Sequence, residues 1–68
     1  MTAKFIETDH AEATNADGTI GIIDRHWYDV DGTEFAITSD NRVLDADGKP
    51  LTDGDSSTVD VRRAIEAA

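Results

Sequence analysis

A short acidic unit recurs three times in the chain, and its carboxylates are the groups best placed to do chemistry. Each unit is Asn or Asp, any residue, Asp and then Gly, at residues 15–18, 29–32 and 45–48. Calcium loops use such closely spaced carboxylates, but they also need an acidic first ligand, where this chain has Trp27 and Val43. Asp-Gly also favours a tight hairpin turn, because both residues tolerate positive φ. We interpret the units as hairpin turns and expect no metal or cofactor, with a calcium-stabilised module kept as an alternative.

The two histidines are the other candidates for chemistry. His10 and His26 are the only imidazoles, and an Asp-Arg pair precedes His26. A catalytic histidine needs a nucleophile, an oxyanion donor and a pocket. The sequence has no motif for these groups, and 68 residues bury little surface with which to form a pocket. We therefore expect structural histidines and a protein that is not an enzyme.

The charge balance narrows the class of partner. Fifteen Asp and Glu against six Lys and Arg give a formal charge of −9, and there is no cysteine for a disulfide or a zinc site. This acidity argues against direct binding to nucleic acid or to an anionic membrane, since both depend on Lys and Arg. No apolar segment approaches the ~20 residues of a membrane span, and Met1–His10 lacks the order of a signal peptide. We expect a cytoplasmic protein.

Turn signals divide residues 3–52 into the strands of a small antiparallel sheet. Lys4–Thr8 is the expected first strand, followed by one helical turn at Asp9–Ala13 with Asp9 as its cap. A second strand is expected at 19–23, and a hairpin of strands 26–30 and 33–37 around the Asp31–Gly32 turn. A softer turn at 39–41 joins residues 35–38 to a strand at 42–44. The last strand is expected to be a short edge around Pro50.

The end of the chain has helical periodicity. Ser57 can cap a helix with Asp60 at its third position, and Val61, Ala64 and Ile65 recur at helical spacing. We expect a helix over 57–67, joined to the sheet by a linker at 53–56. Residues 1–68 then form a single small α+β domain, an antiparallel β-meander of four or five strands covered by one C-terminal helix.

Turn geometry predicts the strand register. A two-residue turn at Asp31–Gly32 places Asp29 opposite Glu34, a like-charge pair on the same face as Trp27. The opposite face carries the core candidates, which are Val30, Tyr28, Phe35 and Ile37. At the third unit a bulged turn is favoured, because it pairs Asp45 with Lys49 and Val43 with Leu51.

The acidic excess lies within residues 1–55, whereas residues 56–68 carry two acids and two bases. Because alternate turns of a meander lie at the same end, we expect five carboxylates to gather there. These are Asp29, Asp31, Glu34, Asp45 and Asp47. Trp27, if it is exposed beside them, would add an aromatic anchor to a partner-binding surface.

In size, acidity, β-rich pattern and lack of a catalytic motif, the chain resembles the DNA-mimic inhibitors that phages and mobile elements make against CRISPR and restriction systems. The resemblance implies a non-enzymatic inhibitor of the anti-CRISPR or anti-restriction type. Its partner would be a basic nucleic-acid-binding protein, for example a CRISPR effector, whose DNA-binding or PAM-reading site is occupied by Asp and Glu side chains. A phage-encoded chain would act in the cytoplasm of the host cell.

Adaptation to concentrated salt is the alternative source of the acidity. Eleven Asp against four Glu and two Lys is typical of a surface kept soluble by screened carboxylates. The protein would then be a small structural or protein-interaction module. Either protein could be a monomer or a homodimer, because Pro50 closes one sheet edge and the other edge is free to pair.

Overall fold

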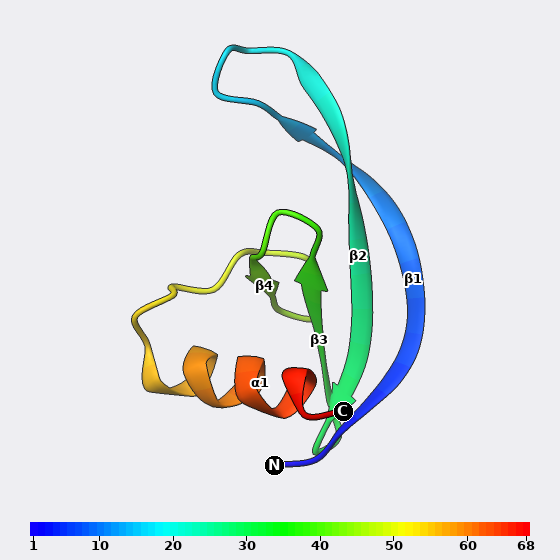
Figure 1. The fold of residues 1–68 in the computed structure, drawn as a ribbon, viewed down its shortest axis with the longest axis vertical. Coiled ribbons are helices and arrows are strands. Elements are labelled where there is room, and N and C mark those ends of the chain that lie inside the picture. The colour runs from blue at the N-terminus through cyan, green and yellow to red at the C-terminus, as the bar shows by residue number, and fades with distance from the viewer.

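The computed structural model describes all 68 residues and contains a curved antiparallel sheet with one helix against it (Figure 1). The four strands are β1 (Ala3–Thr14), β2 (Ile20–Val30), β3 (Thr33–Thr38) and β4 (Val43–Leu44), and they lie side by side in sequence order. The helix α1 (Ser56–Glu66) follows them. The predicted α+β class, a small β-meander with one C-terminal helix, is confirmed.

The central hairpin follows the chemistry of its turn. Asp31 and Gly32 have φ values of 51° and 89°, as a two-residue type I′ turn requires. The register is the one predicted, with Asp29 opposite Glu34 and Trp27 opposite Ala36. Two adjacent residues therefore determine which side chains of β2 and β3 share a face.

β1 and β2 form a long curved ribbon that projects beyond the rest of the sheet (Figure 1). The helical turn predicted at Asp9–Ala13 is wrong, because β1 continues without interruption to Thr14 and pairs with β2 along its length. Likewise, the strands predicted at 19–23 and 26–30 are parts of one strand. Local helix propensity at Ala and Glu residues is worth less than the ladder that β2 offers.

The third acidic turn also has its predicted geometry. Asp45 donates its amide to the Lys49 carbonyl at 2.9 Å, and Leu51 donates its amide to the Val43 carbonyl at 2.8 Å, so the bulged register is confirmed. The predicted last strand is reduced to a single bridge between Leu44 and Pro50. Proline has no amide to extend a ladder, which explains why the pairing stops there.

The helix begins one residue earlier than predicted. The carbonyl of Asp55 accepts the first helical hydrogen bond, from the amide of Val59 at 3.0 Å, so Asp55 and not Ser57 is the N-cap. The Asp55 side chain makes no capping hydrogen bond, and the capping role predicted for Asp60 is not fulfilled. At eleven residues α1 is not long and apolar enough to cross a membrane.

The sheet buries side chains on both faces. Under the helix lies a core of Val30, Val43, Val61, Ala64 and Ile65, with the predicted core residues Tyr28, Phe35 and Ile37 half-buried against it. A second cluster on the opposite face consists of Trp27, Ala36 and Leu44. Neither reaches the tip of the ribbon, where Ile20 and Ile22 are exposed.

Candidate functional site

Three of the predicted site carboxylates lie together at the end of the β2–β3 hairpin. Asp29 and Glu34 are directly opposite each other, and both are exposed. Asp31 occupies the turn, where its Oδ1 accepts a hydrogen bond from the amide of Thr2 at 3.0 Å. Asp29 Oδ1 accepts one from the amide of Gly32 at 2.8 Å. We call Asp29, Asp31 and Glu34 the hairpin-end acids.

A lysine that no sequence motif marks as a site residue lies beside the hairpin-end acids. Lys4 of β1 is opposite Asp29, which therefore has an anion on one neighbouring strand and a cation on the other. The register of β1 depends on a bulge between Phe5 and Glu7. No Gly, Asn or Pro marks that bulge in the sequence, so Lys4 could not be placed in advance.

Asp45 and Asp47 lie in a different turn, and the structure does not bring them to the hairpin-end acids. Gly48 of this turn lines a surface hollow shared with Arg42, which follows the opposite end of β3. The expected gathering of all five carboxylates at one end is therefore wrong. It assumed a full-length return strand, but β4 has only two residues and the chain turns away directly after Leu44.

Trp27 is buried and cannot serve as an exposed anchor. Only 9% of the residue is accessible, and it packs with Ala36 and Leu44. Its Nε1 donates a hydrogen bond to Asp9 Oδ1 at 3.0 Å, and the Arg25 guanidinium lies 5.4 Å from the centre of its ring. Trp27 therefore belongs to the second core cluster and not to a binding surface.

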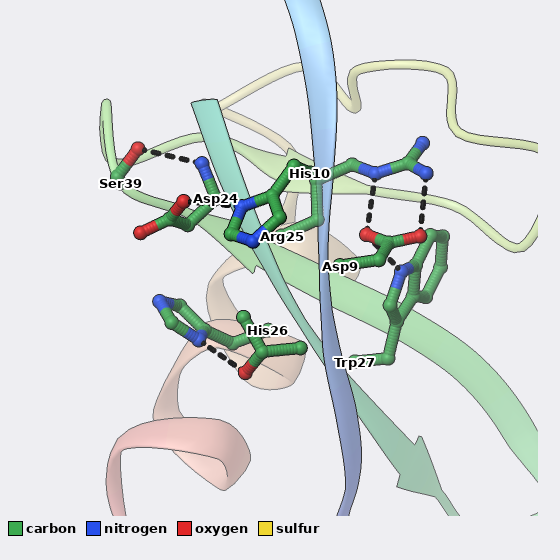
Figure 2. Close-up of polar contacts among 8 residues, drawn as sticks. Asp9, His10, Asp24, Arg25, His26, Trp27 and Ser39 are labelled. Carbon is green, nitrogen blue, oxygen red and sulfur yellow. Dashed lines mark hydrogen bonds and ion pairs between the residues drawn. The ribbon is translucent and has the colours of Figure 1, made fainter. Parts of the chain in front are cut away.

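The polar group that holds Trp27 is a paired carboxylate and guanidinium, shown in Figure 2. Arg25 donates from Nε to Asp9 Oδ1 at 2.8 Å and from Nη2 to Oδ2 at 2.6 Å, a two-pronged ion pair. These hydrogen bonds, with that of Trp27, hold the pKa of Asp9 below its usual range and raise that of Arg25. The sequence does not reveal this pair, because the local pattern around Asp9 is that of a helix cap.

Carboxylates of the acidic turns accept hydrogen bonds from other residues of the same turn. Asp45 Oδ1 accepts hydrogen bonds from the amides of Asp47 and Lys49, both at 2.9 Å. Asp17 Oδ1 accepts hydrogen bonds from the Thr19 hydroxyl at 2.6 Å and from its amide at 3.1 Å, and these hydrogen bonds lower the pKa of Asp17. No group of three or more His, Cys, Asp or Glu side chains is placed to share a metal ion. The contacts of the repeated unit are those of turn formation.

Acid should remove the stabilisation that these hydrogen bonds provide. The folded-state pKa values of Asp9 and Asp17 are lowered from an ordinary 3.8, so their contribution is complete above that pH and disappears as pH falls through the lowered values. We expect the free energy of unfolding to fall below about pH 4 in urea titrations, and to fall less steeply in Asp9→Asn. Asp60→Asn, which removes an exposed carboxylate of α1, should keep the wild-type pH profile; equal profiles for all three proteins would contradict the assignment.

Both histidines bridge the two strands of the ribbon (Figure 2). His10 Nδ1 is 2.7 Å from Asp24 Oδ1, and His26 Nδ1 is 2.9 Å from a threonine hydroxyl of β1. The nearby Ser39 hydroxyl accepts a hydrogen bond from the Asp24 amide at 3.0 Å and makes none with an imidazole. The expected structural role of His10 and His26 agrees with these contacts.

The larger surface hollow of the protein lies elsewhere. It has a volume of about 590 Å³ and lies between the tip of the ribbon and the turns that follow β3 and β4. Ile23, Leu44 and Pro50 give it an apolar lining, and Arg25 and Arg42 also border it. None of the six predicted site residues lines this hollow, so it is separate from the hairpin-end acids.

Comparisons with known proteins identify no relative of this chain. No family model matches the sequence, and no curated protein or solved structure matches the chain.

Proposed function

We propose that the protein is a non-enzymatic inhibitor that binds a basic nucleic-acid-handling protein through the hairpin-end acids. In this proposal Asp29, Asp31 and Glu34 take the place of DNA phosphates in a groove lined by Lys and Arg, as in the effectors of CRISPR or restriction systems. Asp45 and Asp47 form a second, separate acidic turn and are not required for the first contact. Trp27 is excluded from the surface because it is buried.

The observation that supports the proposal is that these carboxylates are exposed and form no ion pair within the protein, although Lys4 lies opposite Asp29. The three arginine ion pairs use other acids, namely Asp9, Asp40 and Asp53, and the fourth close contact joins His10 to Asp24. Asp29 and Glu34 form a directly opposed pair of like charges, which costs stability in a sheet. A cationic partner would remove that cost on binding.

The shape and charge of the hairpin end suit a groove lined by Lys and Arg. The Asp31–Gly32 turn is a narrow two-residue end, and opposed strand residues lie about 4.5–5.5 Å apart. Carboxylates at this spacing are comparable in density to the phosphates of duplex DNA. With a net charge of −9, association with a basic protein should be fast at low salt and should weaken as salt is added.

A DNA-displacement assay tests the proposal. A CRISPR effector and a restriction endonuclease, each bound to fluorescent target DNA, are titrated with the wild type and with Asp29→Asn/Glu34→Gln. The wild type should displace the DNA from a susceptible effector, and the double variant should need about 10- to 100-fold more protein, since two charged contacts are lost. The matched control is Asp60→Asn/Glu66→Gln, which removes the same charge from exposed positions of α1 and should behave as wild type.

Three outcomes would contradict the proposal. The wild type displaces no DNA from any effector tested, the hairpin variant is as active as wild type, or the helix variant loses as much activity as the hairpin variant. The last result would mean that net charge alone, and not the hairpin-end acids, is responsible. Circular dichroism of both variants excludes unfolding as the cause, because the hairpin variant removes a repulsive pair and should be at least as stable as wild type.

The alternative function is an interaction module with a salt-adapted surface. It is favoured by the hydrogen bonds that Asp17, Asp29 and Asp45 make to their own turns, which give these residues a role that needs no partner. Such a protein should be unfolded in dilute buffer and folded in molar salt. Cooperative unfolding in dilute buffer, followed by circular dichroism, would exclude this alternative.

A further inference from the structure

The long strand β1 is an open edge of the sheet. No element lies beyond it in the strand order, and Figure 1 shows it as the outermost strand. Bulges, prolines and lysines normally protect such edges from pairing. The base of β1 has two of these devices, the bulge between Phe5 and Glu7 and the side chain of Lys4. Residues 8–14 have no bulge, proline or lysine, and Asp9 and Glu12 are the charged side chains that could oppose pairing there.

Hydrogen bonds on the inner side show which backbone groups of β1 point outward. Asp24 accepts from the Ser39 amide at 2.9 Å, and its own amide donates to the Ser39 hydroxyl, so both of its backbone groups point toward β3. In an antiparallel ladder the residue opposite must then point its groups the other way. That residue is His10, and by alternation Thr8, Glu12 and Thr14 also present their amides and carbonyls to solvent.

The charges along this edge favour pairing with a second copy of itself in one register. In an antiparallel two-fold pairing with Asp9 or Glu12 on the axis, that acid would face its own copy in the partner subunit. With Thr8 on the axis, Glu7 of each chain would face Asp9 of the other. With Ala11 on the axis, His10 of each chain faces Glu12 of the other, and no acids are opposed. A register centred on His10 opposes no like carboxylates but gains no complementary pair.

We propose that the protein forms a two-fold dimer through residues 8–14 of β1, with Ala11 on the axis and His10 facing Glu12 of the partner subunit. The two sheets join into one of eight strands. His10 contacts Asp24 of β2 at 2.7 Å on the inner side of β1, and in the dimer it would lie between that carboxylate and Glu12 of the partner subunit. Salt should strengthen the dimer, because it screens the repulsion between two chains of charge −9.

Sedimentation velocity tests the proposal with a pair of variants at one exposed position. The wild type at about 1 mM and about 0.5 M salt should sediment at twice the chain mass of 7.4 kDa. Glu12→Pro removes an outward amide that β2 does not use, so it should leave the monomer folded and weaken dimerisation about tenfold or more. Glu12→Gln keeps the amide and should dimerise far better than Glu12→Pro. A wild type that stays monomeric, or a proline variant that dimerises normally, would overturn the proposal.

Disulfide trapping provides a second test that does not depend on the proline variant folding. The chain has no cysteine, so A11C introduces a single thiol on the proposed axis. Opposed residues there would have Cα atoms about 4.5 Å apart, which a disulfide can span. Ala13 lies on the same face, but its two copies would be about 13 Å apart, four residues along the strand. Under mild oxidation A11C should form a covalent dimer rapidly and A13C should not; equal rates would show that this register is wrong.

Discussion

Replacing Trp27 with alanine is expected to cause the largest loss of stability of any single substitution in the chain. Trp27 is the largest member of the second core cluster and is 9% exposed. Removing a buried tryptophan costs about 3–5 kcal/mol, whereas a domain of this length has about 3–10 kcal/mol in total. In urea denaturation followed by far-UV circular dichroism, the midpoint of the variant should move strongly toward zero urea.

Trp27→Phe is the control that separates packing from the hydrogen bond to Asp9. Phenylalanine keeps an aromatic ring beside the Arg25 guanidinium but cannot donate to Asp9, so we expect a loss of about 1–2 kcal/mol and a cooperative transition. If Trp27→Ala instead lost less than about 1 kcal/mol, the second cluster would not be a core. Trp27 would then again be a candidate partner contact.

Ile65→Ala should give the second largest loss of stability. Ile65 is 4% exposed and packs, with Val30 and Val43, at the contact between α1 and the sheet. Isoleucine to alanine in a core costs about 2–5 kcal/mol, which lowers the melting temperature of a domain this small by roughly 10 °C or more. Thermal unfolding followed at 222 nm measures the change.

The neighbouring position provides the matched control for Ile65. Glu66 is exposed on the last turn of α1, so Glu66→Ala should change the free energy of unfolding by less than about 0.5 kcal/mol. Equal effects of the two substitutions would mean that the helix is stabilised by its own propensity and not by its contact with the sheet.

The central hairpin was predictable because the residues that determine its register lie within the turn itself. Asp31 and Gly32 tolerate the positive φ values that a type I′ turn requires, and a two-residue turn leaves one register for the strands that flank it. The core face of Tyr28, Phe35 and Ile37 follows from that register by alternation. The bulged register after β4 was predictable for the same reason.

The first strand was not predictable, because the contacts that determine its conformation are made with residues far away in the sequence. Asp9, Glu12 and the alanines between them satisfy a helix-start pattern. What decides their conformation is the pairing with β2, which also brings Arg25, sixteen residues away, to the Asp9 carboxylate. A local pattern cannot reveal that partner unless the register of β1 and β2 is already known.

The candidate surface was predicted in part. Asp29, Asp31 and Glu34 could be placed together because they belong to one hairpin. Asp45 and Asp47 could not, since their position depends on the length of β4 and on the direction the chain takes after it. The burial of Trp27 likewise depends on cover from Leu44, on a strand that the central turn does not position.

The placement of the chain ends has a practical consequence for handling this protein. Thr2 exchanges hydrogen bonds with Asp31, and Met1 borders a shallow depression with Ala64 and Ala67, so both ends emerge beside the hairpin-end acids (Figure 1). Polypeptide fused at either end would crowd that surface and could mask an interaction. A fluorophore or an immobilisation tag is better attached at the Asn15–Gly18 turn, which lies at the opposite end of the molecule (Figure 1).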